Sequence, residues 1–207
     1  MADNAPAARA ATAPGPEDGA PDLAAVGPIV LVGMMATGKS SVARQLGRRL
    51  HRRVYDSDAM ITARTGRTVA QLFEAGGEPA FRDLETEVLE EALTRQPPGV
   101  VAAAGGVVLS DANRGRLRRV SADGGVVVWL RADPTVLAAR VRPGDHRPLL
   151  ARDPAGTLAR LAREREGLYA EVADRSVDTG RAPFARIVDQ VMAAIGDVAD
   201  QRQTDER

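Results

Sequence analysis

Short runs of apolar residues alternate along this chain with longer stretches in which apolar positions recur every three or four residues. The short runs, rich in Val, Leu, Ile and Ala, are typical of strands buried on both faces of a sheet. They lie at residues 29–32, 54–55, 100–104, 126–130 and around Val177. The longer stretches predict amphipathic helices between the strands. This alternation predicts an α/β fold in which a parallel five-stranded sheet is flanked by helices on both faces.

Several of the predicted helices have recognisable first turns. Thr68 and Gln71 have the spacing of a capping box, in which two side chains satisfy backbone groups at the start of a helix. An acidic residue followed by proline is also favoured at a helix N-terminus. This pair occurs at Glu78-Pro79, Asp133-Pro134 and Asp153-Pro154. A final helix is predicted from the apolar positions between Phe184 and Ile195.

The composition bounds the ordered part of the chain. With 207 residues, 44% of them apolar and 27% charged, the chain is long enough for one well-buried domain, which we place at residues 28–196. Residues 1–27 are rich in Ala, Pro, Gly and Asp, so we expect a disordered tail there. The acidic residues of this tail outweigh its single Arg9, which argues against a transit peptide. Residues 197–207 are expected to form a second, polar tail.

Charge and cysteine content exclude several classes of function. The 28 basic and 28 acidic residues balance, so neither nucleic acid nor an anionic membrane is expected as a partner. The absence of cysteine excludes disulfides and thiolate metal sites and fits a cytoplasmic protein, which we expect to be a monomer. No apolar run approaches the roughly 20 residues needed to cross a membrane.

Residues 33–40 have the G-x-x-x-x-G-K-[ST] pattern of a phosphate-binding loop. The loop follows a predicted strand and opens a predicted helix, where backbone N–H groups and the helix N-terminus can hold phosphates. Lys39 is the only lysine among 28 lysine and arginine residues, which suits a role that the planar group of arginine cannot fill. We therefore expect nucleotide phosphates to be bound here. The expected contacts are Gly33, Met34, Met35, Ala36, Thr37, Gly38, Lys39, Ser40 and Ser41.

Two aspartates follow the second predicted strand. In an extended chain residues two apart share a face, so the carboxylates of Asp56 and Asp58 could point into one site. One would hold Mg²⁺ and the other would serve an acceptor hydroxyl. Because no acidic residue follows the third strand, the metal role falls to Ser40 and Asp56. The alternative is that Asp58 caps the following helix, but capping does not account for Asp56.

Glycines and arginines supply further candidates. Gly105 and Gly106, after the third strand, either let the backbone approach a ligand or simply form a turn. Arg82 lies one turn into the helix that begins near Pro79. Arg142 and Arg147 flank a short polar segment between two helices, and a lid at about residues 142–152 could close over a nucleotide. In a chain so rich in arginine, any one of them is more often a solvated surface charge.

The ordered set of motifs resembles the shikimate kinases. The resemblance runs from about residue 28 to residue 195, and no single motif in it is unique. Its parts are the phosphate loop, Asp56-Ser57-Asp58, Phe81-Arg82 with Glu85, Gly105-Gly106, Arg147-Pro148-Leu149-Leu150, Arg165 before Leu168-Tyr169, and Asp178-Thr179.

The resemblance implies an ATP-dependent phosphorylation of shikimate at its 3-hydroxyl, giving shikimate 3-phosphate and ADP in aromatic amino acid biosynthesis. It implies that Lys39 contacts the β- and γ-phosphates, and that Ser40 binds Mg²⁺ with support from Asp56. Asp58 would accept the proton of the 3-hydroxyl, and Arg147 would stabilise the transferring phosphoryl group.

The remaining roles that the resemblance implies are binding roles. The substrate-binding segment would span about residues 57–95. Arg82 and Arg165 would grip the substrate carboxylate, while Gly105 and Gly106 would meet the substrate through backbone amides. Arg142 would lie over adenine. Glu85 would orient Arg82 from behind.

The chain departs from the family pattern at a few positions. Ala36 and Ala104 stand where glycine is usual, and the lid is short, so a slightly altered backbone is expected. Three alternative functions remain. They are a kinase of a related cyclitol or sugar acid such as gluconate, a nucleoside monophosphate kinase, and a module that binds nucleotide without catalysis. The two arginines favour an acidic substrate, and Asp58 argues against a module that only binds.

Overall fold

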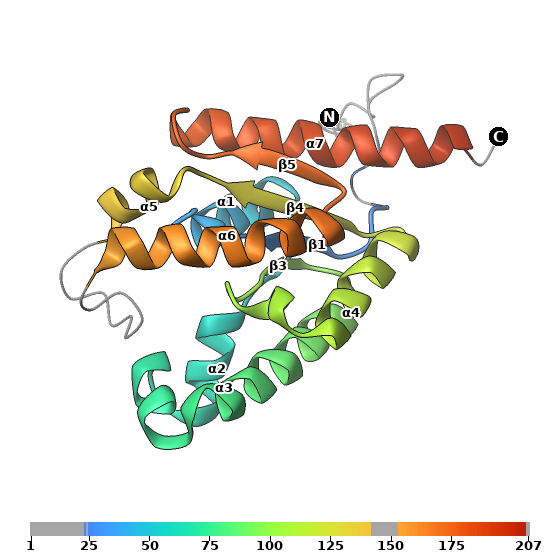
Figure 1. The fold of residues 1–207 in the computed structure, drawn as a ribbon. Helices are drawn as coiled ribbons and strands as arrows, with labels where there is room; N and C mark the ends of the chain where they lie inside the picture. Colours follow the sequence, from blue (N-terminus) through green and yellow to red (C-terminus); the bar gives the residue numbers. More distant parts are fainter. Residues whose placement is uncertain (1–22, 24, 142–152, 206–207) are drawn as a thin grey trace, which may run out of the picture.

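The computed structural model describes Leu23 and residues 25–141 and 153–205 (Figure 1). The expected lid at about 142–152 lies outside these residues, and so do Arg142 and Arg147. Most of the expected N-terminal tail also lies outside them.

A parallel five-stranded sheet forms the centre of the described part, which confirms the predicted fold class. Its strand order is β2-β3-β1-β4-β5. The strands are β1 (Ile29–Val32), β2 (Val54–Asp56), β3 (Val100–Ala102), β4 (Val126–Arg131) and β5 (Arg175–Asp178). Each predicted apolar run is therefore a strand, although β3 ends at Ala102 and β2 extends to Asp56. The central strand β1 is fully buried, as its uninterrupted apolar sequence predicts.

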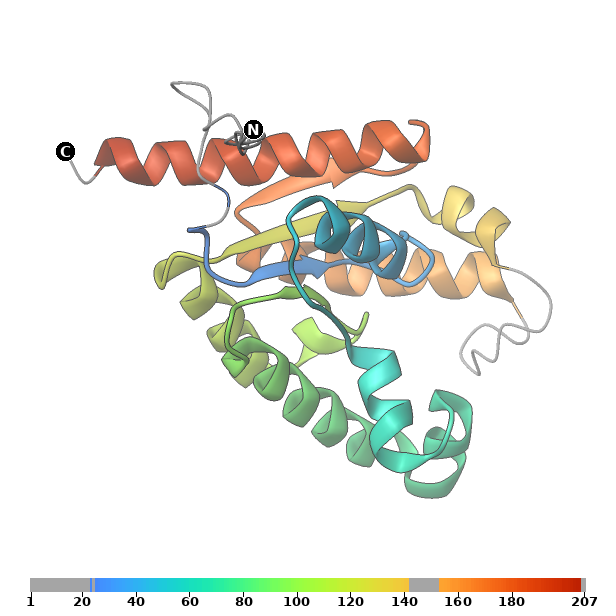
Figure 2. The same ribbon diagram turned by 180° about the vertical axis from the view of Figure 1, so that it is seen from behind.

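Helices cover both faces of this sheet, because successive side chains of each strand point to opposite sides and both sides are apolar. Val30 and Val32 pack into a core that includes residues of α3, α4 and α6, whereas Ile29 and Leu31 pack with α1 and α7. Figure 1 shows α6 in front of the sheet, and Figure 2 shows α1 in front of it from the opposite side. The helices are α1 (Lys39–Arg49), α2 (Ser57–Thr65), α3 (Val69–Thr94), α4 (Asp111–Ala122), α5 (Pro134–Arg140), α6 (Pro154–Val172) and α7 (Phe184–Asp205), with a 3₁₀ turn η1 (Val107–Leu109).

The structure confirms the predicted helix starts. The Thr68 hydroxyl accepts a hydrogen bond from the Gln71 N–H at 3.3 Å, and the Gln71 side chain accepts one from the Thr68 N–H at 2.9 Å. This is the reciprocal capping box that the spacing predicts. Asp133 and Asp153 cap α5 and α6, each followed by proline in the first turn.

Helix α3 consists of two helical segments that meet at Gly77. This residue has φ 71° and ψ −177°, a backbone conformation outside the helix. Pro79 lies at the start of the second segment, where a missing N–H costs no helical hydrogen bond. The second segment packs on α2 through a small separate core that contains Ile61, Phe81 and Val88. Together α2 and α3 extend away from the sheet (Figure 1).

Two boundaries differ from the expected ones. Val26 and Gly27 belong by composition to the expected tail, yet Val26 is buried and the Gly27 N–H donates to the Gly124 carbonyl at 2.9 Å. At the other end, α7 continues to Asp205, past the expected boundary at residue 196, because the buried Val198 prolongs its apolar face. Within the described ranges, no helix is both long and apolar enough to cross a bilayer.

Candidate active site

The phosphate loop connects β1 to α1, which is the strand–loop–helix context that its motif requires. Gly33 has φ +140°, and a Cβ atom there would lie 2.2 Å from the carbonyl oxygen of Leu130, so only glycine fits against β4. Gly38 has φ 93° and precedes α1 without any side-chain cap. The first N–H groups of α1, together with the helix dipole, therefore favour an anion at this end.

Side chains of the loop itself maintain its shape. The Lys39 ammonium donates to the carbonyl oxygens of Gly33 and Met34 at 2.8 and 2.9 Å. The buried Thr37 hydroxyl donates to the same Met34 oxygen at 2.8 Å. Ala36 has φ 64°, a left-handed conformation that costs a non-glycine residue about 1 kcal/mol. Ala36 therefore holds a conformation that glycine would adopt more easily.

The two aspartates after β2 do not lie on one extended face, so this expectation is wrong. Asp56 is the last residue of β2 and the N-cap of α2, since its Oδ1 accepts from the Ala59 N–H at 3.3 Å. Asp58 lies in the first turn of α2 and is exposed. Because the helix begins at Ser57, side chains two residues apart diverge. Capping therefore accounts for Asp56, and the alternative in which Asp58 is the cap is also wrong.

Ser40 and Asp56 offer oxygen ligands of the kind that Mg²⁺ prefers. Ser40 lies in the first turn of α1, and Asp56 lies at the end of β2. Within the described ranges, no group of three or more His, Asp or Glu side chains is placed to hold a metal ion. Mg²⁺ commonly takes only one or two protein ligands and completes its shell with water and substrate phosphates. The donor set therefore fits a metal ion shared with a nucleotide.

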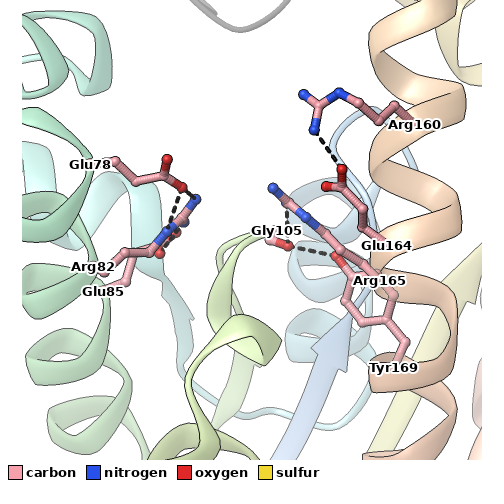
Figure 3. Close-up of polar contacts among 8 residues, drawn as sticks. All are labelled: Glu78, Arg82, Glu85, Gly105, Arg160, Glu164, Arg165 and Tyr169. Carbon is pink, nitrogen blue, oxygen red and sulfur yellow. Dashed lines mark hydrogen bonds and ion pairs between the residues drawn. The ribbon is translucent and has the colours of Figure 1, made fainter.

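Arg82 lies on the second segment of α3 and is held by two carboxylates (Figure 3). Its Nη1 pairs with Glu85, while its Nη2 and Nε donate to Oε1 of Glu78 at 2.6 and 3.2 Å. Positions three and four residues apart on a helix share a face, which brings the three side chains together. A Cβ atom on Gly106 would lie 1.7 Å from Nη1 of Arg82. A side chain at this position would therefore displace the guanidinium group from its present place.

Arg165 lies on α6 and is only 4% exposed. Its Nη1 donates to the Gly105 carbonyl at 3.1 Å, and the Tyr169 hydroxyl donates to the same oxygen at 2.6 Å. The Tyr169 ring stacks on Trp129 of β4, with ring centroids 5.8 Å apart. The buried Nε of Arg165 has no hydrogen-bond partner in the part of the chain that the structure describes.

The sequence-predicted arginines Arg82 and Arg165 belong to one site. Figure 3 shows their guanidinium groups reaching toward one another from α3 and α6, with Gly105 close to Arg165. The Gly105-Gly106 turn contacts both arginines, because Gly105 accepts from Arg165 and Gly106 leaves room for Arg82. The turn that follows β3 therefore joins the two sides of the site.

Burial and paired charges oppose each other at Arg82 and Glu85, and burial prevails only for Glu85. Desolvation raises the pKa of Glu85, which the charge of Arg82 offsets only in part, and the charge of Asp58 raises it further. Desolvation alone would lower the pKa of Arg82, but Glu85 and Glu78 outweigh this and raise it overall. Desolvation prevails for Glu85 but not for Arg82, because the Glu85 side chain is 3% exposed whereas 20% of the Arg82 side chain remains exposed. The influence of Asp58 on Glu85 places Asp58 within electrostatic range of this ion pair.

Three residues with clear positions at the site were not assigned roles from the sequence. Tyr169 supports the Gly105 carbonyl, and burial raises the pKa of its phenol so that it stays a neutral donor. Glu78 binds Arg82. Arg140, at the end of α5, donates through Nη2 to the carbonyl of Thr179 at 2.5 Å, and its Nη1 lies 3.5 Å from the carbonyl of Ala36 in the phosphate loop. These three residues stand out only by their contacts in the folded protein. The sequence therefore gave no indication of their roles, although the neighbouring motifs were recognisable.

Comparisons with known proteins identify the family. A family model described as Shikimate kinase matches residues 35–196. A shikimate kinase of Aromatoleum aromaticum is 45% identical over 168 residues, which cover 81% of this chain and 93% of the relative. One of Rhodopseudomonas palustris is 38% identical over 200 residues, which cover 95% and 94%.

Solved structures give the same result. A shikimate kinase from Acinetobacter baumannii, in complex with shikimate, superimposes with a TM-score of 0.77 and is 34% identical, covering 83% of this chain and 93% of that one. The family model, the sequence relatives and this structure all point to one family. The chain belongs to the shikimate kinase family.

Proposed function

We propose that this protein transfers the γ-phosphoryl group of ATP to the 3-hydroxyl of shikimate, giving shikimate 3-phosphate and ADP. The observation that carries the proposal is the pair of arginines, Arg82 and Arg165, joined by the Gly105-Gly106 turn in a protein with a complete phosphate loop. Two guanidinium groups can hold a planar carboxylate, and each charged hydrogen bond contributes about 1.5–3 kcal/mol. A neutral polyol would make no such use of them.

The phosphate loop and the start of α1 bind the nucleotide in this proposal. Lys39 exchanges its contacts with the Gly33 and Met34 carbonyls for contacts with the β- and γ-phosphates. Ser40 and Asp56 hold Mg²⁺, which neutralises charge on the phosphates when it is bound. The uncapped N-terminus of α1 adds its partial positive charge to the same end.

The substrate side of the site contributes position and a base. Arg82 and Arg165 fix the carboxylate, which orients the ring and its hydroxyls. Asp58 accepts the proton of the 3-hydroxyl as the phosphoryl group is transferred. Its effect on Glu85 supports a position near the arginine that holds the substrate. The roles of Arg142 over adenine and of Arg147 on the transferring group remain predictions, because both lie outside the described residues.

A coupled assay of ATP consumption tests this function. With Mg²⁺ and ATP present, we expect shikimate to raise the rate strongly, and quinate and gluconate to raise it little. Asp58→Asn should lower kcat by about 100-fold or more while ATP binding is retained, because general base catalysis contributes factors of this size. Turnover of gluconate or quinate in preference to shikimate would refute the proposed substrate. Equal loss of ATP binding and turnover in Asp58→Asn would refute the role of Asp58.

A further inference from the structure

The guanidinium group of Arg82 is already occupied by carboxylates of its own helix. Glu78 takes the edge formed by Nε and Nη2, with distances of 3.2 and 2.6 Å to a single oxygen. Glu85 takes Nη1. The edge formed by Nε and Nη2 is one that a bidentate carboxylate would use. A substrate carboxylate that binds this edge must therefore replace Glu78.

The two carboxylates differ in how easily they can leave Arg82. Glu85 is 3% exposed, so its charge would be stranded in the interior without the arginine. The Glu78 side chain is 54% exposed, and a released carboxylate there would be hydrated at once. Exposed pairs of this kind stabilise a protein only slightly. Glu85 is thus a permanent partner of Arg82, whereas Glu78 is a replaceable one.

With Glu78 in place, the charges of Arg82 and Arg165 are matched by those of Glu78 and Glu85, and Asp58 adds a further negative charge nearby. Arg82 and Arg165 carry two positive charges, and the buried Glu85 carries one negative charge. One further carboxylate neutralises the remainder, and in this structure Glu78 supplies it. We propose that Glu78 is an internal counterion that the substrate carboxylate displaces from Arg82, so that competition with Glu78 sets the affinity for acidic substrates. This inference rests on the proposed carboxylate-binding role of Arg82.

The backbone beside Glu78 provides a place for the released side chain. Gly77 breaks α3 with φ 71° and ψ −177°, so Glu78 begins the second helical segment. A carboxylate in the first turn of a helix is favoured by the helix dipole, whether or not it also contacts Arg82. The displaced Glu78 therefore keeps a stabilising environment, which lowers the cost of the exchange.

The test compares Glu78→Gln with wild type by calorimetric titration of shikimate and of its neutral carboxamide. Removing an exposed competing charge should tighten shikimate binding about two- to fivefold. The carboxamide carries no charge with which to displace Glu78 from Arg82, so its affinity for Glu78→Gln should stay within twofold of that for wild type. In the kinetic assay the KM for shikimate should fall in proportion, while kcat and the KM for ATP stay within twofold. Glu74→Gln, an exposed glutamate earlier on α3, is the matched control and should change neither titration.

Each outcome separates the possible roles of Glu78. Weaker binding of shikimate by Glu78→Gln would overturn the inference, because it would make Glu78 a support for Arg82 rather than a competitor. Equal changes for shikimate and the carboxamide would also overturn it, since a merely structural role affects both ligands alike. If Glu74→Gln tightened shikimate binding by the same factor, the change would come from the lower net negative charge of the protein. That result would also overturn the inference. If the wild-type protein does not bind shikimate at all, the proposed function fails together with the inference, and this outcome is visible before any variant is made.

Discussion

Glu85 illustrates how the surroundings of a single residue determine its chemistry. It lies on α3 beside Arg82, on the buried side of the helix, and is 3% exposed. Its pKa is raised because burial penalises the charged form more than Arg82 stabilises it. Glu78 pairs with the same arginine from about two turns before Glu85 and remains exposed. Two identical side chains therefore have different consequences for stability, because only one of them is removed from water.

The raised pKa of Glu85 predicts the pH dependence of stability. A group whose pKa is higher in the folded state than in the unfolded state contributes stability at low pH and loses it as the pH rises through the folded value. The ordinary pKa of a glutamate is 4.5, so the loss should begin above this pH. The free energy of unfolding of wild type, relative to Glu85→Gln, should therefore decrease as the pH rises from about 4.5 toward neutrality.

Urea denaturation at a series of pH values measures this difference. Glu87→Gln, on an exposed part of the same helix, controls for the removal of one carboxylate. A relative stability of wild type that increases with pH would mean that the ion pair with Arg82 outweighs burial. Such an increase would contradict a raised pKa for Glu85.

At the scale of elements, the arm formed by α2 and α3 depends for its stability more on helix capping than the central sheet does. The sheet packs between two large apolar cores, whereas α2 and α3 meet around a small cluster that includes Ile61, Phe81 and Val88. The first segment of α3 ends at Gly77. A short segment with a small core needs good capping to hold its first turn. The reciprocal hydrogen bonds of Thr68 and Gln71 supply it.

Removal of this cap should destabilise the protein measurably. Thr68→Ala deletes the oxygen that accepts from the Gln71 N–H, and loss of such a cap costs about 1 kcal/mol. The free energy of unfolding, measured by urea denaturation, should fall by about this amount. Thr94→Ala is a matched control at the far end of α3, where the hydroxyl bonds back to the carbonyls of Glu90 and Glu91 in its own helix. It should change stability by less than about 0.5 kcal/mol. Equal losses in the two variants would show that the capping box has no special role.

For the whole molecule, strand order decides where the site forms. The central β1 lies between β3 and β4, and the chain leaves it toward α1 through the phosphate loop. The turn after β3 lies beside this loop and meets Arg165 from α6. In parallel sheets, ligands bind beyond the carboxyl ends of the strands, where connections to opposite sides diverge. Residues distant in sequence therefore meet at one edge of the sheet.

Ligand binding at this edge should stabilise the entire domain. A nucleotide that binds only the folded state raises the free energy of unfolding by about 2.7 kcal/mol at a concentration 100 times its Kd. We expect MgATP to produce a stabilisation of this size in wild type. Lys39→Met should lose most of it at the same MgATP concentration, because the ammonium that meets the phosphates is gone. Stabilisation by shikimate should be retained.

Thermal denaturation with each ligand, in both proteins, measures these effects. For each protein, the melting temperature with ligand is compared with that of the same protein without ligand. A change in the stability of unliganded Lys39→Met therefore does not affect the comparison. A full MgATP shift in Lys39→Met would contradict the role of Lys39. Loss of the shikimate shift as well would indicate that the substitution disturbs more than the phosphate loop.

The sequence by itself determined the features that depend on neighbouring residues. Apolar runs located β1, β3 and β4, because a strand buried on both faces requires them. The partly exposed β2 and β5 were located from shorter apolar stretches. The capping residues located the starts of α3, α5 and α6, because a cap acts within one helical turn. The phosphate loop was recognisable because its glycines and its lysine act within a single octet.

The tertiary structure alone decided how separate segments meet. The exposed fractions of Glu78 and Glu85 depend on what packs against α3, so two similar glutamates could not be told apart in the sequence. Asp56 and Asp58 do not share an extended strand, because α2 begins at Ser57, with Asp56 as its N-cap and Asp58 in its first turn. Tyr169 meets Gly105 only because α6 packs against η1, next to the turn that follows β3. Local structure follows from short-range sterics and hydrogen bonds, whereas contacts between distant segments follow from packing, which no single stretch of sequence contains.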